Sequence, residues 1–148
     1  MTQKTDLETL LHLPAARAIG DDLLICGLPS AADLAAARDG GIRTIVSLCT
    51  AGECAYDEAE TVRHLGMNYV NIPVKVPDSV NEDNARLLDA ILEVGPTLVH
   101  CTTGNRGAAL LALRAFHIAG LDPEEALAAG RLAGLTKLEP LVRERLRR

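Results

Sequence analysis

A cysteine and an arginine flank a short polar loop in the stretch Thr97-Leu98-Val99-His100-Cys101-Thr102-Thr103-Gly104-Asn105-Arg106-Gly107. The apolar residues before Cys101 predict a strand that carries the thiol to the carboxyl edge of a sheet. The Ala- and Leu-rich residues that begin near Arg106 predict a helix whose positive end points at the thiol. Backbone N–H groups, the helix dipole and the guanidinium would each favour a thiolate there. This order of residue types is typical of a nucleophile beside an oxyanion site.

We therefore expect the loop to hold a tetrahedral anion next to Cys101. Gly104 accepts a positive φ and allows close approach of the backbone, and Arg106 can hold two anion oxygens with its planar fork. The candidate substrate-binding residues are the loop and its two flanks, His100, Thr102, Thr103, Gly104, Asn105 and Gly107. A buried cysteine is commonly an inert core residue, so the prediction depends on the conjunction of thiol, glycine and arginine.

The length, charge and cysteine content of the chain limit the classes of protein that it can belong to. The 148 residues are predicted to form a single domain over residues 1–148. The net charge of −5 argues against a general nucleic-acid binder. The amino-terminal residues lack a long apolar stretch, so we expect neither a signal peptide nor a membrane span, and a cytoplasmic location. The four cysteines form no C-x-x-C pair, so no metal site is predicted.

Alternating strand-like and helix-like segments must position the loop. They predict an α/β domain with a mostly parallel sheet of four to five strands and helices on both faces. The expected strands cover 22–26, 44–49, 68–74 and 97–101. The expected helices run from Ser30 to Gly40, over 55–65, from a capping box at Ser79–Glu82 through Val94, over 106–119, from an Asp122 N-cap to Ala133, and over 137–147.

The loop resembles the signature of the cysteine-dependent dual-specificity phosphatase superfamily, in which five residues separate His-Cys from Arg. Here four residues separate Cys101 from Arg106, which is similar to a bacterial phosphatase-like family called beta-lactamase-hydrolase-like or DUF442. Other stretches also look like that family, and the resemblance covers most of the chain: 26–30, 41–48 followed by Gly52-Glu53, 69–74 and 133–135. It implies a compact dual-specificity-phosphatase-like α/β fold.

The resemblance also implies a reaction. The thiolate of Cys101 would attack phosphorus to form a phosphocysteine, and Arg106 would hold the equatorial oxygens. An acid on a separate loop would protonate the leaving group, and water would hydrolyse the intermediate. Asp78 is our choice for that acid, although Glu82 or Asp83 could serve instead and Asp78 could be a plain turn residue. The implied substrate is a phosphorylated small molecule or phosphoprotein, phosphotyrosine included, with no cofactor.

Two features keep other functions open. Gly107 stands where related phosphatases carry a serine or threonine that helps the cysteine leave, which puts fast turnover in doubt. The six residues from Cys101 to Arg106 match the loop length of rhodaneses, so Cys101 could instead carry a persulfide in sulfur transfer. A third reading is a phosphate-binding module that turns nothing over. In phosphatases the residue corresponding to His100 supports the loop and the thiolate through hydrogen bonds.

Cys49 ends the predicted second strand beside the loop. The phosphatase and tensin homologue has a cysteine at the corresponding place that pairs with its nucleophile under oxidation. The resemblance therefore suggests a reversible Cys49–Cys101 disulfide that protects the nucleophile. Cys54 is a weaker candidate for the same role, and a buried thiol without a partner is the alternative for Cys49.

Overall fold

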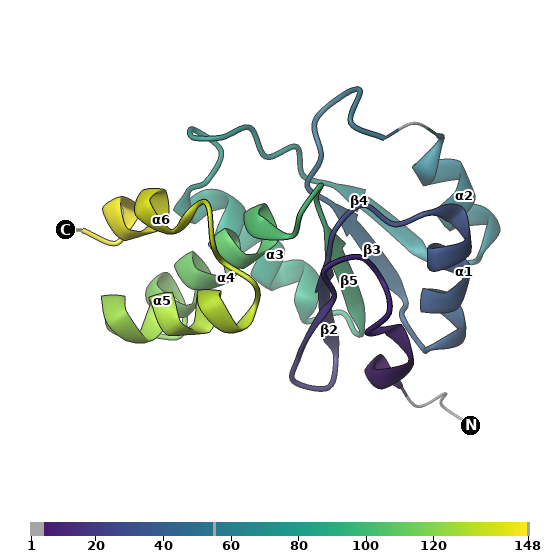
Figure 1. The fold of residues 1–148 in the computed structure, drawn as a ribbon, viewed down its shortest axis with the longest axis horizontal. Coiled ribbons are helices and arrows are strands. Elements are labelled where there is room, and N and C mark those ends of the chain that lie inside the picture. Colours follow the sequence, from purple (N-terminus) through teal and green to yellow (C-terminus); the bar gives the residue numbers. More distant parts are fainter. Residues whose placement is uncertain (1–4, 55, 148) are drawn as a thin grey trace.

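The computed structural model describes residues 5–54 and 56–147. One five-stranded sheet runs through it in the order β1-β2-β5-β3-β4 (Figure 1). β1 lies antiparallel to β2, and all other neighbours are parallel. This arrangement confirms the predicted mostly parallel α/β sheet. The strands are β1 (Arg17–Ile19), β2 (Leu23–Cys26), β3 (Thr44–Ser47), β4 (Asn68–Asn71) and β5 (Thr97–His100).

Helices cover both faces of the sheet, as expected (Figure 1). The short 3-10 helix η1, α1 and α2 pack on one face, and α3 to α6 lie on the other. The helices are η1 (Leu7–Leu10), α1 (Ala31–Asp39), α2 (Glu58–His64), α3 (Glu82–Leu92), α4 (Asn105–His117), α5 (Pro123–Leu132) and α6 (Glu139–Arg145). Within the described ranges, no helix combines the length and the apolar character needed to cross a bilayer.

Capping residues set most helix starts where the sequence predicts them. Ser30 and Asp33 form a reciprocal capping box at α1, and Asp122 does the same with Glu125 at α5. The capping box expected at Ser79 is wrong, because α3 begins later. Its N-cap is Asn81, whose side chain accepts a hydrogen bond from the backbone of Asn84 at 2.9 Å.

β5 is the central strand of the sheet. Its four residues are all buried, and it pairs in parallel with β2 on one side and β3 on the other. Leu98 packs into the core under α1 and α2, whereas Val99 packs into the core under α4, because successive side chains of a strand point to opposite faces. The residue after β5 therefore leaves the sheet between two other carboxyl ends, where parallel α/β sheets form their sites.

Candidate active site

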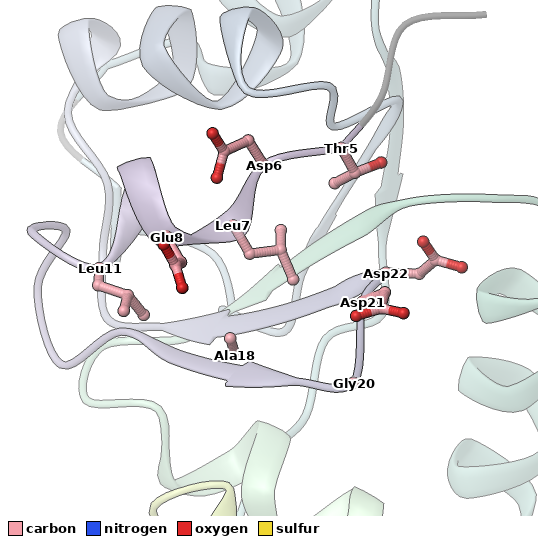
Figure 2. A pocket seen from close by; sticks show the side chains of 9 residues that line it. All are labelled: Thr5, Asp6, Leu7, Glu8, Leu11, Ala18, Gly20, Asp21 and Asp22. Carbon is pink, nitrogen blue, oxygen red and sulfur yellow. The ribbon is translucent and has the colours of Figure 1, made fainter.

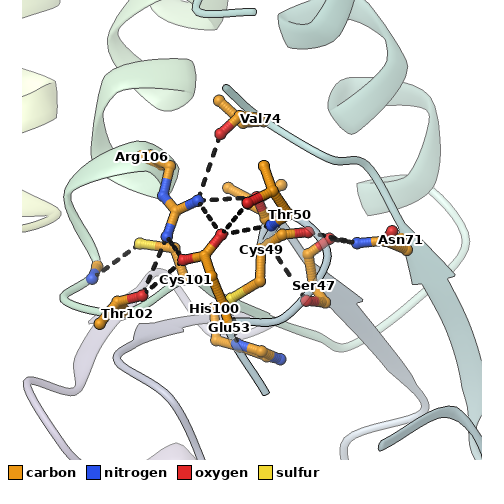
Figure 3. Close-up of polar contacts among 12 residues, drawn as sticks. Ser47, Cys49, Thr50, Glu53, Asn71, Val74, His100, Cys101, Thr102 and Arg106 are labelled. Carbon is orange, nitrogen blue, oxygen red and sulfur yellow. Dashed lines mark hydrogen bonds and ion pairs between the residues drawn. The ribbon is translucent and has the colours of Figure 1, made fainter. Parts of the chain in front are cut away.

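Cys101 follows β5 directly and is 1% exposed. Its Sγ accepts a hydrogen bond from the backbone N–H of Gly104 at 3.0 Å (Figure 3). Gly104 makes this contact with φ of +88°, a conformation that favours glycine, and it is also the N-cap of α4. The loop thus turns back on itself and brings the helix start to the sulfur.

The amino end of α4 is free to bind an anion. Gly104 provides no side chain to cap this helix. In the described part of the chain, the N–H groups of Asn105, Arg106 and Gly107 find no backbone acceptor. These donors carry the positive end of the dipole of a 13-residue helix, which attracts negative charge.

Glu53 holds the Arg106 side chain in a two-point ion pair (Figure 3). Glu53 Oε1 lies 2.5 Å from Nη2, and Oε2 lies 3.0 Å from Nη1. Nη1 also donates to the carbonyls of Leu48 and Val74, each at 3.3 Å, and Nη2 donates to Thr102 Oγ1 at 3.1 Å. Both η nitrogens are therefore engaged, and only Nε is left without a partner among the described residues.

Both partners of the Glu53–Arg106 pair are ionised in the folded protein. The hydrogen bonds from Arg106, and then those from Thr50 and Thr102, hold the pKa of Glu53 well below its usual range against the opposing effect of burial. The same contact raises the pKa of Arg106. A bound oxyanion must therefore use Nε and the loop N–H groups, or displace Glu53 from the guanidinium.

The loop side chains have different partners. Thr102 donates its hydroxyl to Glu53 at 2.8 Å, so it belongs to the Arg106 network, and Thr103 is exposed. The Asn105 amide faces the connection between α5 and α6, where Oδ1 accepts from the backbone of Thr136 at 2.9 Å. Only the backbone of Asn105 can therefore face an anion. The spacing of residues in the loop does not show that the side chain turns away.

Gly107 packs the start of α4 against the sheet. A Cβ placed there would lie 3.3 Å from Cγ2 of Ile25 and 3.5 Å from Cγ1 of Val99. This tight contact gives a physical reason for glycine where related phosphatases carry a hydroxyl residue. Gly27 plays a similar part, since a Cβ there would lie 2.8 Å from the carbonyl oxygen of Thr102.

The His100 imidazole points away from the Cys101 side of the strand. Its Nδ1 lies 4.0 Å from Cys49 Sγ, and its Nε2 lies 2.6 Å from Oε2 of Glu58. Consecutive strand residues face opposite sides of a sheet, so the ring of His100 and the thiol of Cys101 are separated. The sequence reasoning singled out neither Glu53 nor Glu58 as a partner, because pairings across about 50 residues leave no local signal.

Asp78 lies on the segment between β4 and α3, whereas Glu82 and Asp83 lie in the first turn of α3. Near the start of the segment that carries Asp78, the Val74 carbonyl accepts a hydrogen bond from Arg106. Asp78 is exposed in the turn that follows. Glu82 is engaged elsewhere, since it pairs with Arg86 at 2.8 Å and with His117 at 3.4 Å, and its pKa is lowered mainly by Arg86. Asp83 lies exposed in the first turn of α3.

A hollow on the described surface lies at the other end of the strands from the Cys101 loop (Figure 2). Its volume is about 690 Å³, and it lies where the β1–β2 hairpin approaches η1. Four carboxylates line it, those of Asp6, Glu8, Asp21 and Asp22. Such a surface repels anions, so it does not compete with the Cys101 loop for a phosphorylated ligand.

Comparisons with known proteins find similar structures at low sequence identity. By sequence, no protein-family model and no curated protein matches the chain. A candidate phosphatase of the DUF442 group from Shewanella putrefaciens CN-32 superposes with a TM-score of 0.68 and 22% identity, covering 94% of this chain and 95% of that one. A candidate phosphatase from Neisseria meningitidis Z2491 gives a TM-score of 0.73 and 23% identity, covering 89% and 96%.

A third similar structure is that of Pseudomonas aeruginosa TpbA in complex with phosphotyrosine. It gives a TM-score of 0.69 and 20% identity, covering 98% of this chain and 87% of TpbA. The chain therefore has the α/β fold of cysteine-dependent phosphatases. Its neighbours include the DUF442 proteins that the shortened Cys101–Arg106 loop resembles.

Proposed function

We propose that the protein is a cysteine-dependent hydrolase of phosphomonoesters. One observation carries the proposal: the Cys101 sulfur lies at the uncapped amino end of α4, 3.0 Å from the Gly104 N–H, with Arg106 fixed beside it. That arrangement joins a nucleophile to preorganised donors for an oxyanion. The phosphatase fold supports it.

In the proposed reaction, Cys101 Sγ attacks phosphorus and the ester oxygen leaves, so that a phosphocysteine forms. The N–H groups at the start of α4 and the Arg106 guanidinium stabilise the charge that develops on the phosphoryl oxygens. Water then attacks the phosphocysteine and releases phosphate and the free thiol. The Glu53 pair keeps the guanidinium oriented through both steps, because it anchors both η nitrogens.

Asp78 is the proposed proton donor to the leaving oxygen. It lies on the segment that begins at Val74 beside Arg106, and it makes no side-chain hydrogen bond or ion pair with any described residue. Glu82 is less suited, because its pairs with Arg86 and His117 keep it ionised. An aryl phosphate such as phosphotyrosine fits the proposal, as the TpbA complex shows that ligand on the same fold.

Two leaving groups test the proposed acid. We expect both p-nitrophenyl phosphate and phenyl phosphate to be hydrolysed by the wild type and neither by Cys101→Ser. Asp78→Asn should lower kcat on phenyl phosphate by about 10²–10⁴-fold, the usual worth of a general acid. It should affect p-nitrophenyl phosphate far less, since that leaving group needs little protonation. Equal losses on both substrates would exclude Asp78 as the acid.

The short loop supports a second candidate function, sulfur transfer. The ring from Cys101 to Arg106 contains six residues, the rhodanese length, and would fit a persulfide or a small sulfur oxyanion. This reaction needs Cys101 but no proton donor. Transfer of sulfur from thiosulfate to cyanide that is lost in Cys101→Ser and unchanged in Asp78→Asn would favour it. Phosphate binding with neither activity would indicate a binding module.

A further inference from the structure

A second thiol, Cys49, has surroundings that the proposed reaction does not use. It follows β3 and is 5% exposed. The exposed part faces a cavity of about 400 Å³ that residues 47–54, 56–58 and β4 help to line. Cys54, Tyr56, Tyr69 and Asn71 are among the described residues that line this cavity, and Cys101 is not. A small molecule can therefore reach Cys49 by a route of its own.

Cys49, His100 and Glu58 form a buried line of thiol, imidazole and carboxylate. Cys49 Sγ lies 4.0 Å from His100 Nδ1, and His100 Nε2 lies 2.6 Å from Glu58 Oε2. The carboxylate thus lies directly beside the imidazole, although the two atoms are not aligned as a hydrogen bond. The Tyr69 hydroxyl donates to the other Glu58 oxygen at 3.0 Å and fixes the carboxylate. A base oriented by a third group is the usual way to activate a nucleophile.

The His100 imidazole is needed because burial alone would keep the Cys49 thiol protonated and unreactive. Desolvation raises the pKa of Cys49, Ser47 opposes that rise through a hydrogen bond, and the charges of Glu53 and Arg106 act in opposite directions. With its proton on Nε2, toward Glu58, His100 offers an unprotonated Nδ1 to the Cys49 S–H. Proton transfer to Nδ1 leaves a thiolate beside an imidazolium that Glu58 stabilises.

Cys54 is placed to react with Cys49. The two cysteines flank a β-turn in which Glu53 N donates to Thr50 O at 3.3 Å and Gly52 has φ of +88°. Only four residues separate the two cysteines, so the chain keeps them close to each other. Both thiols are free in the structure and line the same cavity.

We propose that Cys49 is a second reactive cysteine, which a hydroperoxide oxidises and which Cys54 then captures as a disulfide. The Cys49 thiolate attacks the O–O bond of hydrogen peroxide. An S–O bond forms, and the departing hydroxide takes the proton from His100 and leaves as water. The Cys54 thiolate then attacks the sulfenic sulfur, the S–O bond breaks, and hydroxide leaves with the Cys54 proton as a second water. Two thiols and one peroxide give one disulfide and two waters.

The disulfide would change the proposed phosphatase site, a consequence that rests on the proposed function. Glu53 lies between the two cysteines in sequence and holds both η nitrogens of Arg106. Closing the Cys49–Cys54 ring would constrain the turn that carries Glu53, and we expect this constraint to disturb its two-point contact with Arg106. Oxidation at Cys49 would therefore weaken oxyanion binding beside Cys101 without any reaction at Cys101.

Peptide mapping of the Cys101→Ser protein tests the disulfide independently of any catalysis. After hydrogen peroxide and alkylation under non-reducing conditions, trypsin releases Cys49 and Cys54 together in peptide 44–63. We expect this peptide to lose two hydrogens and to resist alkylation. Cutting after Glu53 should leave its two halves joined until reduction. Cys26 in peptide 18–38 is the internal control and should stay reduced, because it is fully buried.

Two results would overturn the proposal. One is a peptide 44–63 that remains fully alkylated after peroxide. The other, in the protein that retains Cys101, is a cross-link from peptide 44–63 to peptide 87–106, which would assign Cys49 to Cys101 instead. The base is tested by Glu58→Gln and by Tyr69→Phe, which leaves the carboxylate in place. Each should slow oxidation of Cys49 several-fold, and unchanged rates in both would exclude the His100 relay.

The effect on the neighbouring site is measured with inorganic phosphate. Oxidised Cys101→Ser protein should bind phosphate more weakly than the reduced protein, and Cys54→Ala in the same background should remove the difference. Equal binding in both redox states would refute the link between the two sites. Failure of the reduced protein to bind phosphate would refute the proposed function instead, and the disulfide result would stand.

Discussion

At the scale of single residues, Arg106 depends on Glu53. A guanidinium beside a buried thiol could swing into several positions, but two carboxylate oxygens and two backbone carbonyls hold this one. The sequence shows Gly52-Glu53 only as part of a family resemblance, and nothing in its spacing indicates a pair with Arg106. The nucleophile and its arginine could be predicted because they share one loop, whereas this partner lies in the separate loop that follows β3.

Glu53→Gln should loosen Arg106 and destabilise the fold. We expect kcat/KM for p-nitrophenyl phosphate to fall about tenfold, and the free energy of unfolding at neutral pH to fall by about 1–3 kcal/mol, the worth of a charged hydrogen bond. Because the folded pKa of Glu53 is lowered, its contribution is present above the ordinary pKa of about 4.3 and is lost as the pH falls through the folded value. Urea unfolding across pH checks this. A stability difference that persists unchanged in strong acid would contradict it.

At the scale of secondary-structure elements, packing sets limits on the chemistry. α4 must start within a few residues of Cys101 and also lie against β2 and β5, and Gly107 makes that possible. The strands and most helix ends followed from alternation and capping, as at Ser30 and Asp122. The three-residue β1 was not predicted, since two of its residues are exposed and pairing with β2 alone defines it.

Gly107→Ser tests whether the missing hydroxyl limits turnover. The added Cβ crowds Ile25, so we expect a loss of about 1–3 kcal/mol in unfolding free energy, typical of an overpacked core. Gly107→Ala is the matched control, with the same crowding and no hydroxyl. If the hydroxyl helps Cys101 leave, the serine variant should hydrolyse the phosphocysteine faster than the alanine variant. Equal rates would show that the glycine does not limit the reaction.

α6 supports the segment that carries Asp78. Arg145 donates from Nε to the carbonyl of Val80 at 3.0 Å and from Nη2 to that of Pro77 at 3.1 Å. Arg145→Ala should therefore lower kcat on phenyl phosphate several-fold and leave Cys101 alkylation by iodoacetamide unchanged. Arg143→Ala is the control, because among the described residues that arginine pairs with Glu124 and Glu139 and not with the segment that carries Asp78. An Arg145→Ala variant with full activity would show that the hydrogen bonds from Arg145 to Val80 and Pro77 are not needed.

At the scale of the whole molecule, the Cys101 loop and an acidic surface lie at opposite ends of the parallel strands. The net charge of −5 gives no sign of a phosphate site, yet the donors at the start of α4 and Arg106 converge at the carboxyl ends of β2, β3 and β5. The acidic hollow of Figure 2 lies at the other ends of the strands. The alternation of strand-like and helix-like segments predicts the α/β class, but only the folded topology shows where each charge lies.

The proposed phosphocysteine is the central claim, and trapping it is the most direct test. Wild-type protein is mixed with p-nitrophenyl phosphate, stopped by denaturation within the first turnover and digested with trypsin. We expect peptide 87–106 to carry the added mass of one phosphoryl group on Cys101, and the same peptide from Cys101→Ser to carry none. Release of p-nitrophenol at the full wild-type rate in Cys101→Ser, or a phosphoryl group on a residue other than Cys101, would contradict the account.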